Sequence, residues 1–136
     1  MNSDKVLSFF KEITMIPRES GHEEHIIAYL QDFAAKNNLE CKTDKAGNVL
    51  ITKEAAPGYE DVPVIVLQSH SDMVCEKNSD VEFDFDTQPI NAVVDGEWVR
   101  AEGTTLGADC GIGMAAAMAL LLVEFIFSHI ILKRIP

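Results

Sequence analysis

The sequence predicts an α/β fold in which helices cover a sheet in a three-layer arrangement. Two amphipathic helical patterns open the chain, and segments of strand character follow and then mix with a further helix. The apolar run VPVIVLQ, residues 62–68, is typical of a central strand that is covered on both faces. At 136 residues the chain has room for one domain with a core of useful size.

Helical spacing of apolar residues predicts the first two elements. The first helix begins at Ser3 or Asp4 and ends before Pro17, since the residue preceding a proline avoids helical geometry. A second helix follows over residues 20–38, where Ser20 and Glu23 stand at the spacing of a capping box.

Strand signals occupy the middle of the chain. Residues 39–53 predict two short strands across a turn, and a hairpin-like pair is expected around residues 95–96. Trp98 lies in that pair and is expected to be core or half-core. A glycine-dense loop, TTLGADCGIG at residues 104–113, leads into a helix rich in alanine, methionine and leucine.

Charge and cysteine content restrict the functional class. The net charge of −11 disfavours nucleic acid and anionic lipid as partners. The three cysteines form no CxxC pair and are odd in number, which favours free thiols in a reducing compartment over a disulfide framework. The amino terminus has no long apolar stretch of the secretory type, so a cytoplasmic location is expected.

Polar residues follow the apolar run at once, in the stretch QSHSDMV. His70 and Asp72 stand two apart, so on an extended strand end both side chains project to one face. An imidazole can bind a metal while a nearby carboxylate orients the ring. Spacing alone does not separate this metal site from an ordinary polar strand end.

Asp109 lies between glycines just before the last helix, where it suits either a metal ligand or a helix N-cap. The adjoining Cys110 is read more simply as a small residue at a helix start than as a thiolate ligand. The stretch HEEH, residues 22–25, has two histidines three apart but does not match HExxH, so a solvated helix start is the simpler interpretation.

Taken together, these stretches resemble a known family. VLQSHSDMVCEKN, followed by EWVRAEGTTLGADCGIGMAAAMALL, is similar to the aminoacyl-histidine dipeptidases, the Xaa-His branch of the co-catalytic zinc exopeptidases. The stretches ITMIPRESGHEEHIIAYLQDFA and DKAGNVLI resemble the same enzymes in the same order. The resemblance runs over roughly residues 5–122 and implies the N-terminal part of a three-layer α/β/α catalytic domain.

The resemblance implies a role for each candidate residue. His70 would ligate one Zn²⁺, Asp109 would bridge two Zn²⁺ ions, and Asp72 would be the catalytic acid that orients the active-site groups. The peptide bond between Asp109 and Cys110 would be cis. The implied reaction is hydrolysis of a dipeptide amide with two metal ions.

The chain also departs from the family pattern. An adjacent pair of glutamates, one of them the general base, and later Asp and His ligands are expected, but only Glu124 and His129 follow Asp109 and neither lies in a matching motif. We therefore divide the chain into a partial catalytic domain, residues 1–122, and a non-matching tail, residues 123–136, that a shifted reading frame would explain. The chain alone is expected to be inactive, to bind zinc weakly and to self-associate through an uncovered strand edge or apolar face.

A different functional class also fits part of the sequence. Residues 112–132 are long and apolar enough for a tail anchor, although Glu124 would cost about 2.5–3.5 kcal/mol on insertion into a bilayer. The alternative to an enzyme is therefore a non-enzymatic remnant or a membrane-associating protein, with membrane association the less favoured reading.

Overall fold

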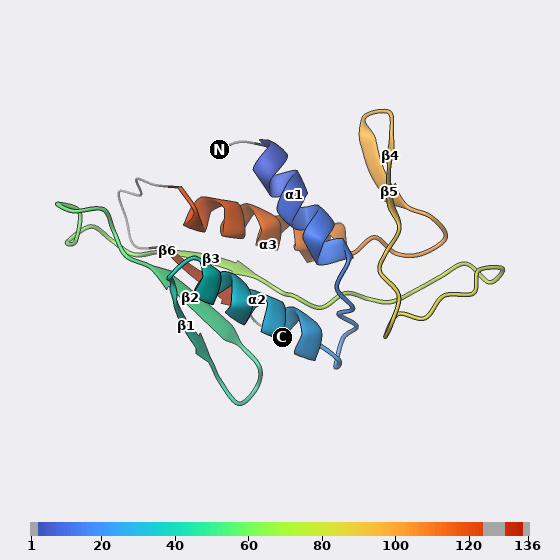
Figure 1. Ribbon diagram of the computed structural model, residues 1–136, viewed down its shortest axis with the longest axis horizontal. Coiled ribbons are helices and arrows are strands. Elements are labelled where there is room, and N and C mark those ends of the chain that lie inside the picture. The colour runs from blue at the N-terminus through green and yellow to red at the C-terminus, as the bar shows by residue number, and fades with distance from the viewer. Residues whose placement is uncertain (1–2, 124–129, 135–136) are drawn as a thin grey trace.

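The computed structural model describes residues 3–123 and 130–134 and confirms the predicted α/β class in an incomplete form (Figure 1). Three helices are present in these ranges: α1 (Ser3–Thr14), α2 (Glu24–Lys36) and α3 (Ala108–Leu121). Their inward faces follow the apolar spacing of the sequence. In α1 this face consists of Val6, Phe10 and Ile13, which are buried at positions three to four residues apart.

The predicted capping box at the start of α2 is wrong. The helix begins at Glu24 with Glu23 as its N-cap residue, and no side chain caps it. Glu23 instead accepts a hydrogen bond from the backbone N–H of Gly21 at 2.9 Å. The hydroxyl of Ser20 lies elsewhere, against Asp72. A tertiary hydrogen bond has therefore replaced the local one that the spacing predicted.

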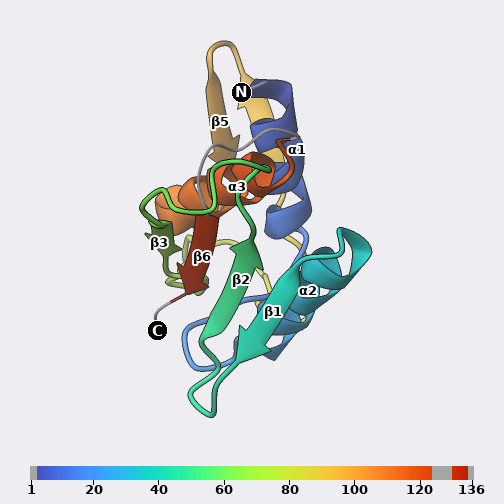
Figure 2. The same ribbon diagram turned by 90° about the vertical axis from the view of Figure 1, so that its left-hand side faces the viewer.

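Four strands form the main sheet, which Figure 2 shows side by side. Their order is β1 (Glu40–Thr43), β2 (Val49–Lys53), β6 (Ile130–Arg134) and β3 (Ile65–Ser69). β6 runs antiparallel to β2 and parallel to β3. The predicted pair of strands within residues 39–53 is confirmed as the antiparallel pair of β1 and β2.

One face of this sheet packs against the helices. Val49, Ile51, Ile130 and Leu132 are buried in the same apolar cluster as the inward residues of all three helices. Side chains alternate between the two faces of a strand, so Leu50 and its neighbours on the other face are more open. The described part of the chain thus has a helix-covered face and a more exposed one.

The apolar run is not the doubly covered central strand that it predicts. β3 lies at one end of the sheet order, and Ile65 and Val66 in it are 49% and 54% exposed. Only β6 pairs with it among the described residues. Continuous apolar composition predicts burial on both faces, but the described chain supplies only one neighbouring strand.

A separate two-stranded sheet projects beside α1 (Figure 1). It consists of β4 (Ala92–Asp95) and β5 (Trp98–Ala101), which confirms the predicted hairpin. The expectation that Trp98 is core or half-core is wrong, because 77% of this residue is exposed. An isolated hairpin leaves one face open, and Trp98 lies on a strand with little other cover.

The last helix and the strand after it include parts of residues 112–136, for which the sequence predicted a tail and, as the alternative, a membrane anchor. α3 ends at Leu121, and β6 then takes an inner position in the sheet, so part of the segment predicted not to match contributes to the core. Within residues 3–123 and 130–134, no helix meets the length and apolarity needed to cross a bilayer. Glu124, the charged residue inside the predicted anchor, and His129, the one histidine after Asp109 in the sequence, lie outside the described residues.

Candidate metal centre

The fold brings the three predicted site residues together. His70 and Asp72 follow the end of β3, and Asp109 lies in the first turn assigned to α3. The Nε2 atom of His70 is 3.5 Å from Oδ1 of Asp109, although 39 residues separate them in sequence. This convergence was expected from the resemblance, and the geometry shows the side chains close to one another.

Asp72 holds the other side of the imidazole ring. The Nδ1 atom of His70 lies 3.1 Å from Oδ1 of Asp72 and 3.1 Å from the carbonyl oxygen of the same residue. Both partners are acceptors, so Nδ1 carries the ring proton and donates it. In the tautomer with its proton on Nδ1, the lone pair of the ring is on Nε2, which faces Asp109.

The Asp72 carboxylate is itself fixed by a hydroxyl. Ser20 Oγ donates to Oδ2 of Asp72 at 2.5 Å. Burial opposes ionisation of Asp72, but the hydrogen bonds from Ser20 and His70 and the attraction of the imidazole outweigh burial and lower the pKa of this carboxyl. The Asp72 carboxylate is therefore favoured as an anion and accepts a hydrogen bond from each neighbour.

Arg18 joins the two loops of the site and was missed in the sequence. Its side chain is almost completely buried, and Nη1 donates to the carbonyl oxygens of Ser71 and Asp72 at 3.0 Å each. Nη2 donates to the carbonyl oxygen of Gly107 at 2.5 Å. Burial lowers the pKa of Arg18, and the Asp72 carboxylate opposes that shift. All three acceptors are backbone atoms, so no residue type in the sequence marks this role.

The glycine-dense loop has a shape that brings backbone close to Arg18. Gly107 has φ of +68°, a left-handed conformation that favours glycine, and a Cβ there would overlap Arg18 and Met73. The peptide bond between Asp109 and Cys110 is cis, as the resemblance implied. Asp109 has non-helical backbone angles and a fully exposed side chain, and no side chain caps the helix.

An open pocket of about 370 Å³ lies over these residues. Its lining includes His70, Asp72, Thr105, Leu106 and Asp109. The pocket is wide enough for a small polar molecule to approach the Nε2 atom and the Asp109 carboxylate together.

The donor geometry fits one zinc ion shared by His70 and Asp109. Zinc lies about 2.0–2.2 Å from nitrogen or oxygen ligands, which places two tetrahedral ligands about 3.4 Å apart. The observed 3.5 Å between Nε2 and Oδ1 agrees with that separation. A zinc site needs three or four protein ligands, and the described residues place no cluster of three such donors here. The centre is therefore partial.

No protein-family model matches the chain, but comparison with known proteins gives relatives of part of it. Cytosol non-specific dipeptidase of Escherichia coli (strain K12) is 48% identical over 115 residues, which are 85% of this chain and 24% of that protein. An uncharacterized protein of Bacillus subtilis (strain 168), YqjE, is 29% identical over 125 residues. The chain thus spans about a quarter of the length of the first of these relatives.

Solved structures show the same resemblance. The crystal structure of aminoacylhistidine dipeptidase from Vibrio alginolyticus matches with a TM-score of 0.91 and 44% identity, over 96% of this chain and 27% of that one. A tripeptidase from Staphylococcus aureus shares the fold with a TM-score of 0.78, at 22% identity and over 36% of its length. The predicted resemblance is confirmed: in sequence and in fold, this chain resembles about one quarter of an aminoacyl-histidine dipeptidase.

Proposed function

We propose that the chain carries part of the metal centre of a cytoplasmic dipeptidase that hydrolyses Xaa-His dipeptides. The observation that supports this most directly is the placement of one imidazole between two carboxylates, with Nδ1 held by Asp72 and Nε2 facing Asp109. His70 and Asp109 would hold Zn²⁺, and Asp72 would keep the ring oriented. When bound, a zinc pair supplies Lewis-acid polarisation of the amide carbonyl and an activated water.

The remaining residues act by positioning. Ser20 and Arg18 fix the loop that carries Asp72, and Arg18 also fixes the loop before Asp109. Asp72 keeps the proton of the imidazole on Nδ1, so that Nε2 is available as a ligand. The pocket over His70 and Asp109 would receive the polar backbone of a dipeptide.

In this proposal the 136-residue chain hydrolyses no dipeptide by itself. The general base and the later metal ligands of the family are not found in matching motifs, and only two donors converge at the described centre. We also propose that residues 1–122 are a partial catalytic domain and that residues 123–136 result from a shifted reading frame. β6 would then act as a substitute strand that completes part of the sheet.

Zinc titration followed by ¹⁵N NMR of the imidazole rings tests the proposed ligand directly. We expect Nε2 of His70 to shift on addition of Zn²⁺ and the shift to be lost in Asp109→Asn, while His25→Gln leaves it unchanged. An unchanged His70 resonance at saturating zinc would show that His70 is not a ligand.

Hydrolysis of glycyl-histidine with added Zn²⁺ tests the proposed incompleteness. We expect no turnover by the wild-type chain or by His70→Ala. Turnover that disappears in His70→Ala would overturn the incomplete site and require ligands from a second copy or from the residues that follow α3. Resequencing of the gene tests the proposed origin of residues 123–136. A downstream reading frame that is intact and in register would rule out the frameshift.

A further inference from the structure

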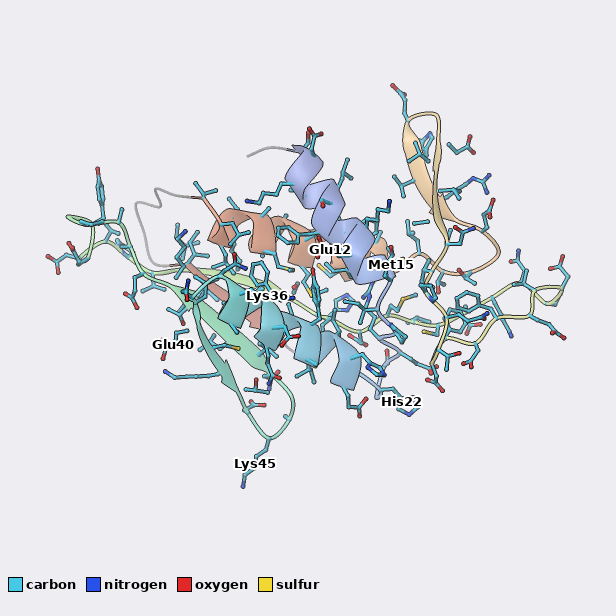
Figure 3. All side chains as sticks on the ribbon, viewed as in Figure 1. Glu12, Met15, His22, Lys36, Glu40 and Lys45 are labelled. Carbon is cyan, nitrogen blue, oxygen red and sulfur yellow. The ribbon has the colours of Figure 1, made fainter. Side chains whose placement is uncertain are left out.

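A second group of metal-binding side chains lies outside the site described above. It comprises Glu19, His22 and Asp86, whose donor atoms all lie within 4.8 Å of one another. Glu19 and His22 lie on the connection between α1 and α2, and Figure 3 shows His22 at the end of α2 remote from Lys36. Asp86 comes from the loop before β4. Two segments far apart in sequence therefore contribute to one cluster.

The distances within this cluster match shared metal coordination better than direct pairing. The Nδ1 atom of His22 is 3.7 Å from Oε2 of Glu19 and 3.5 Å from Oδ1 of Asp86. Both separations exceed the usual 2.7–3.2 Å of a hydrogen bond. They are close to the separation of about 3.4 Å between two tetrahedral ligands of a zinc-like ion.

Charge favours a cation at the same point. The two carboxylates lie close enough to repel each other, and a divalent ion between them converts that repulsion into attraction. Burial is the main cause that raises the pKa of the Cys75 thiol to about 11, and the carboxylates of Glu19 and Asp86 add to this shift against the opposing effect of Arg18. One nitrogen and two oxygen donors suit a divalent d-block ion such as Zn²⁺ better than Ca²⁺, which takes six to eight oxygens.

The backbone holds both halves of the cluster in place. Glu19 forms a β-bridge with Met73, and the backbone N–H of His22 donates to the carbonyl oxygen of Glu19 at 2.9 Å. On the other side, the backbone N–H of Asp86 donates to Oδ1 of Asp84 at 3.0 Å. Little chain movement is needed to bring the three donors onto one ion.

We propose that Glu19, His22 and Asp86 form a second, surface site for a divalent d-block cation, separate from the His70–Asp109 centre. Water completes the coordination, because the three donors are exposed to solvent. Binding ties the α1–α2 connection to the loop around Asp86 and so supports the segment that carries Ser20.

Zinc binding is measured by calorimetry on the full chain carrying His70→Gln and Asp109→Asn, which removes the other centre. We expect one Zn²⁺ to bind, and His22→Gln added to this chain to weaken binding at least about tenfold. His25→Gln is the matched control, since it removes an exposed histidine three residues further on, in the first turn of α2 and outside the cluster. Asp86→Asn should weaken binding as His22→Gln does.

Absence of zinc binding by the His70→Gln, Asp109→Asn chain would overturn the proposal, and so would equal losses from His22→Gln and His25→Gln. In the ¹⁵N NMR titration of the wild-type chain, Nδ1 of His22 should shift, whereas the dipeptidase proposal concerns Nε2 of His70. The His22 resonance tests the surface site and the His70 resonance tests the dipeptidase centre, so failure of one proposal is distinguishable from failure of the other. Circular dichroism of each variant verifies that the fold is retained.

Discussion

Arg18 donates from Nη2 to the carbonyl oxygen of Gly107, two residues before Asp109, while its Nη1 donates to the backbone that carries Asp72. One buried guanidinium thus holds together the two loops whose side chains form the candidate metal centre. We expect the distance between His70 and Asp109 to depend on this contact, because neither loop belongs to a regular strand at that point.

Replacement of Arg18 by leucine should destabilise the chain by about 3–5 kcal/mol, since one buried and two partly buried carbonyl groups lose a charged donor. Urea unfolding followed by circular dichroism measures the change. Arg100→Leu is the matched control, because Arg100 pairs with Asp95 on the exposed hairpin and its loss should change stability by about 1 kcal/mol or less. Similar losses from the two substitutions would contradict the role assigned to Arg18.

Gly107→Ala should be more damaging than Gly21→Ala. Both glycines have positive φ, so either substitution introduces backbone strain of about 1–2 kcal/mol. At Gly107 the new methyl group also overlaps Arg18 and Met73, whereas at Gly21 it meets no atom within 4 Å. The difference between the two free energies of unfolding isolates the steric contact, and equal values would show that the loop accommodates the methyl group.

Asp72→Asn should reduce stability in a manner that depends on pH. The pKa of Asp72 is lowered in the folded chain, so its contribution is fully present above the ordinary carboxyl pKa of about 3.9 and is lost as pH falls through the folded value. Unfolding free energies of the wild type and the variant should therefore differ more at pH 5 than at pH 2.5. If the difference in unfolding free energy stays constant or increases on acidification, ionised Asp72 does not stabilise the folded chain.

Val66→Lys should reduce self-association of the chain. Val66 is 54% exposed on β3, and lysine on an edge strand discourages pairing with another chain. Analytical ultracentrifugation measures the effect, and the free energy of unfolding should change by about 1 kcal/mol or less. Val94→Lys, on the separate β4–β5 hairpin, is the control. If the wild-type chain is already monomeric, or if both variants behave alike, β3 is not the associating surface.

Residue patterns were sufficient to predict most of the local elements that precede β6. The apolar spacing of Val6, Phe10 and Ile13 predicted α1, because a helix buries residues three and four apart whatever its partner. His70 and Asp72 stand two apart just after an apolar run, and the alternation of side chains along a strand predicted that both project to one face of its end. The resemblance to the dipeptidase family, which rests on residue order and type, predicted that Asp109 lies near His70.

The exposure of individual residues depended on tertiary structure. The apolar run containing Val66 predicted a strand covered on both faces, but cover requires neighbouring strands and helices. Among the described residues only β6 pairs with β3, and of the helices α3 contacts it. Trp98 is exposed for a related reason, because its hairpin stands apart from the main sheet. Composition indicates which residues favour burial, whereas the number of packed neighbours decides whether burial occurs.

Sequence by itself indicated the helices and strands that precede β6, because periodicity acts locally, and the resemblance to a known family indicated His70, Asp72 and Asp109 as candidate site residues. Only the tertiary structure decided that Ser20 contacts Asp72 instead of capping α2, and that Arg18 clamps two loops through their carbonyl oxygens. Every residue has a backbone carbonyl, so a contact with one leaves no pattern in the sequence, and long-range hydrogen bonds compete with local ones only after the chain has folded.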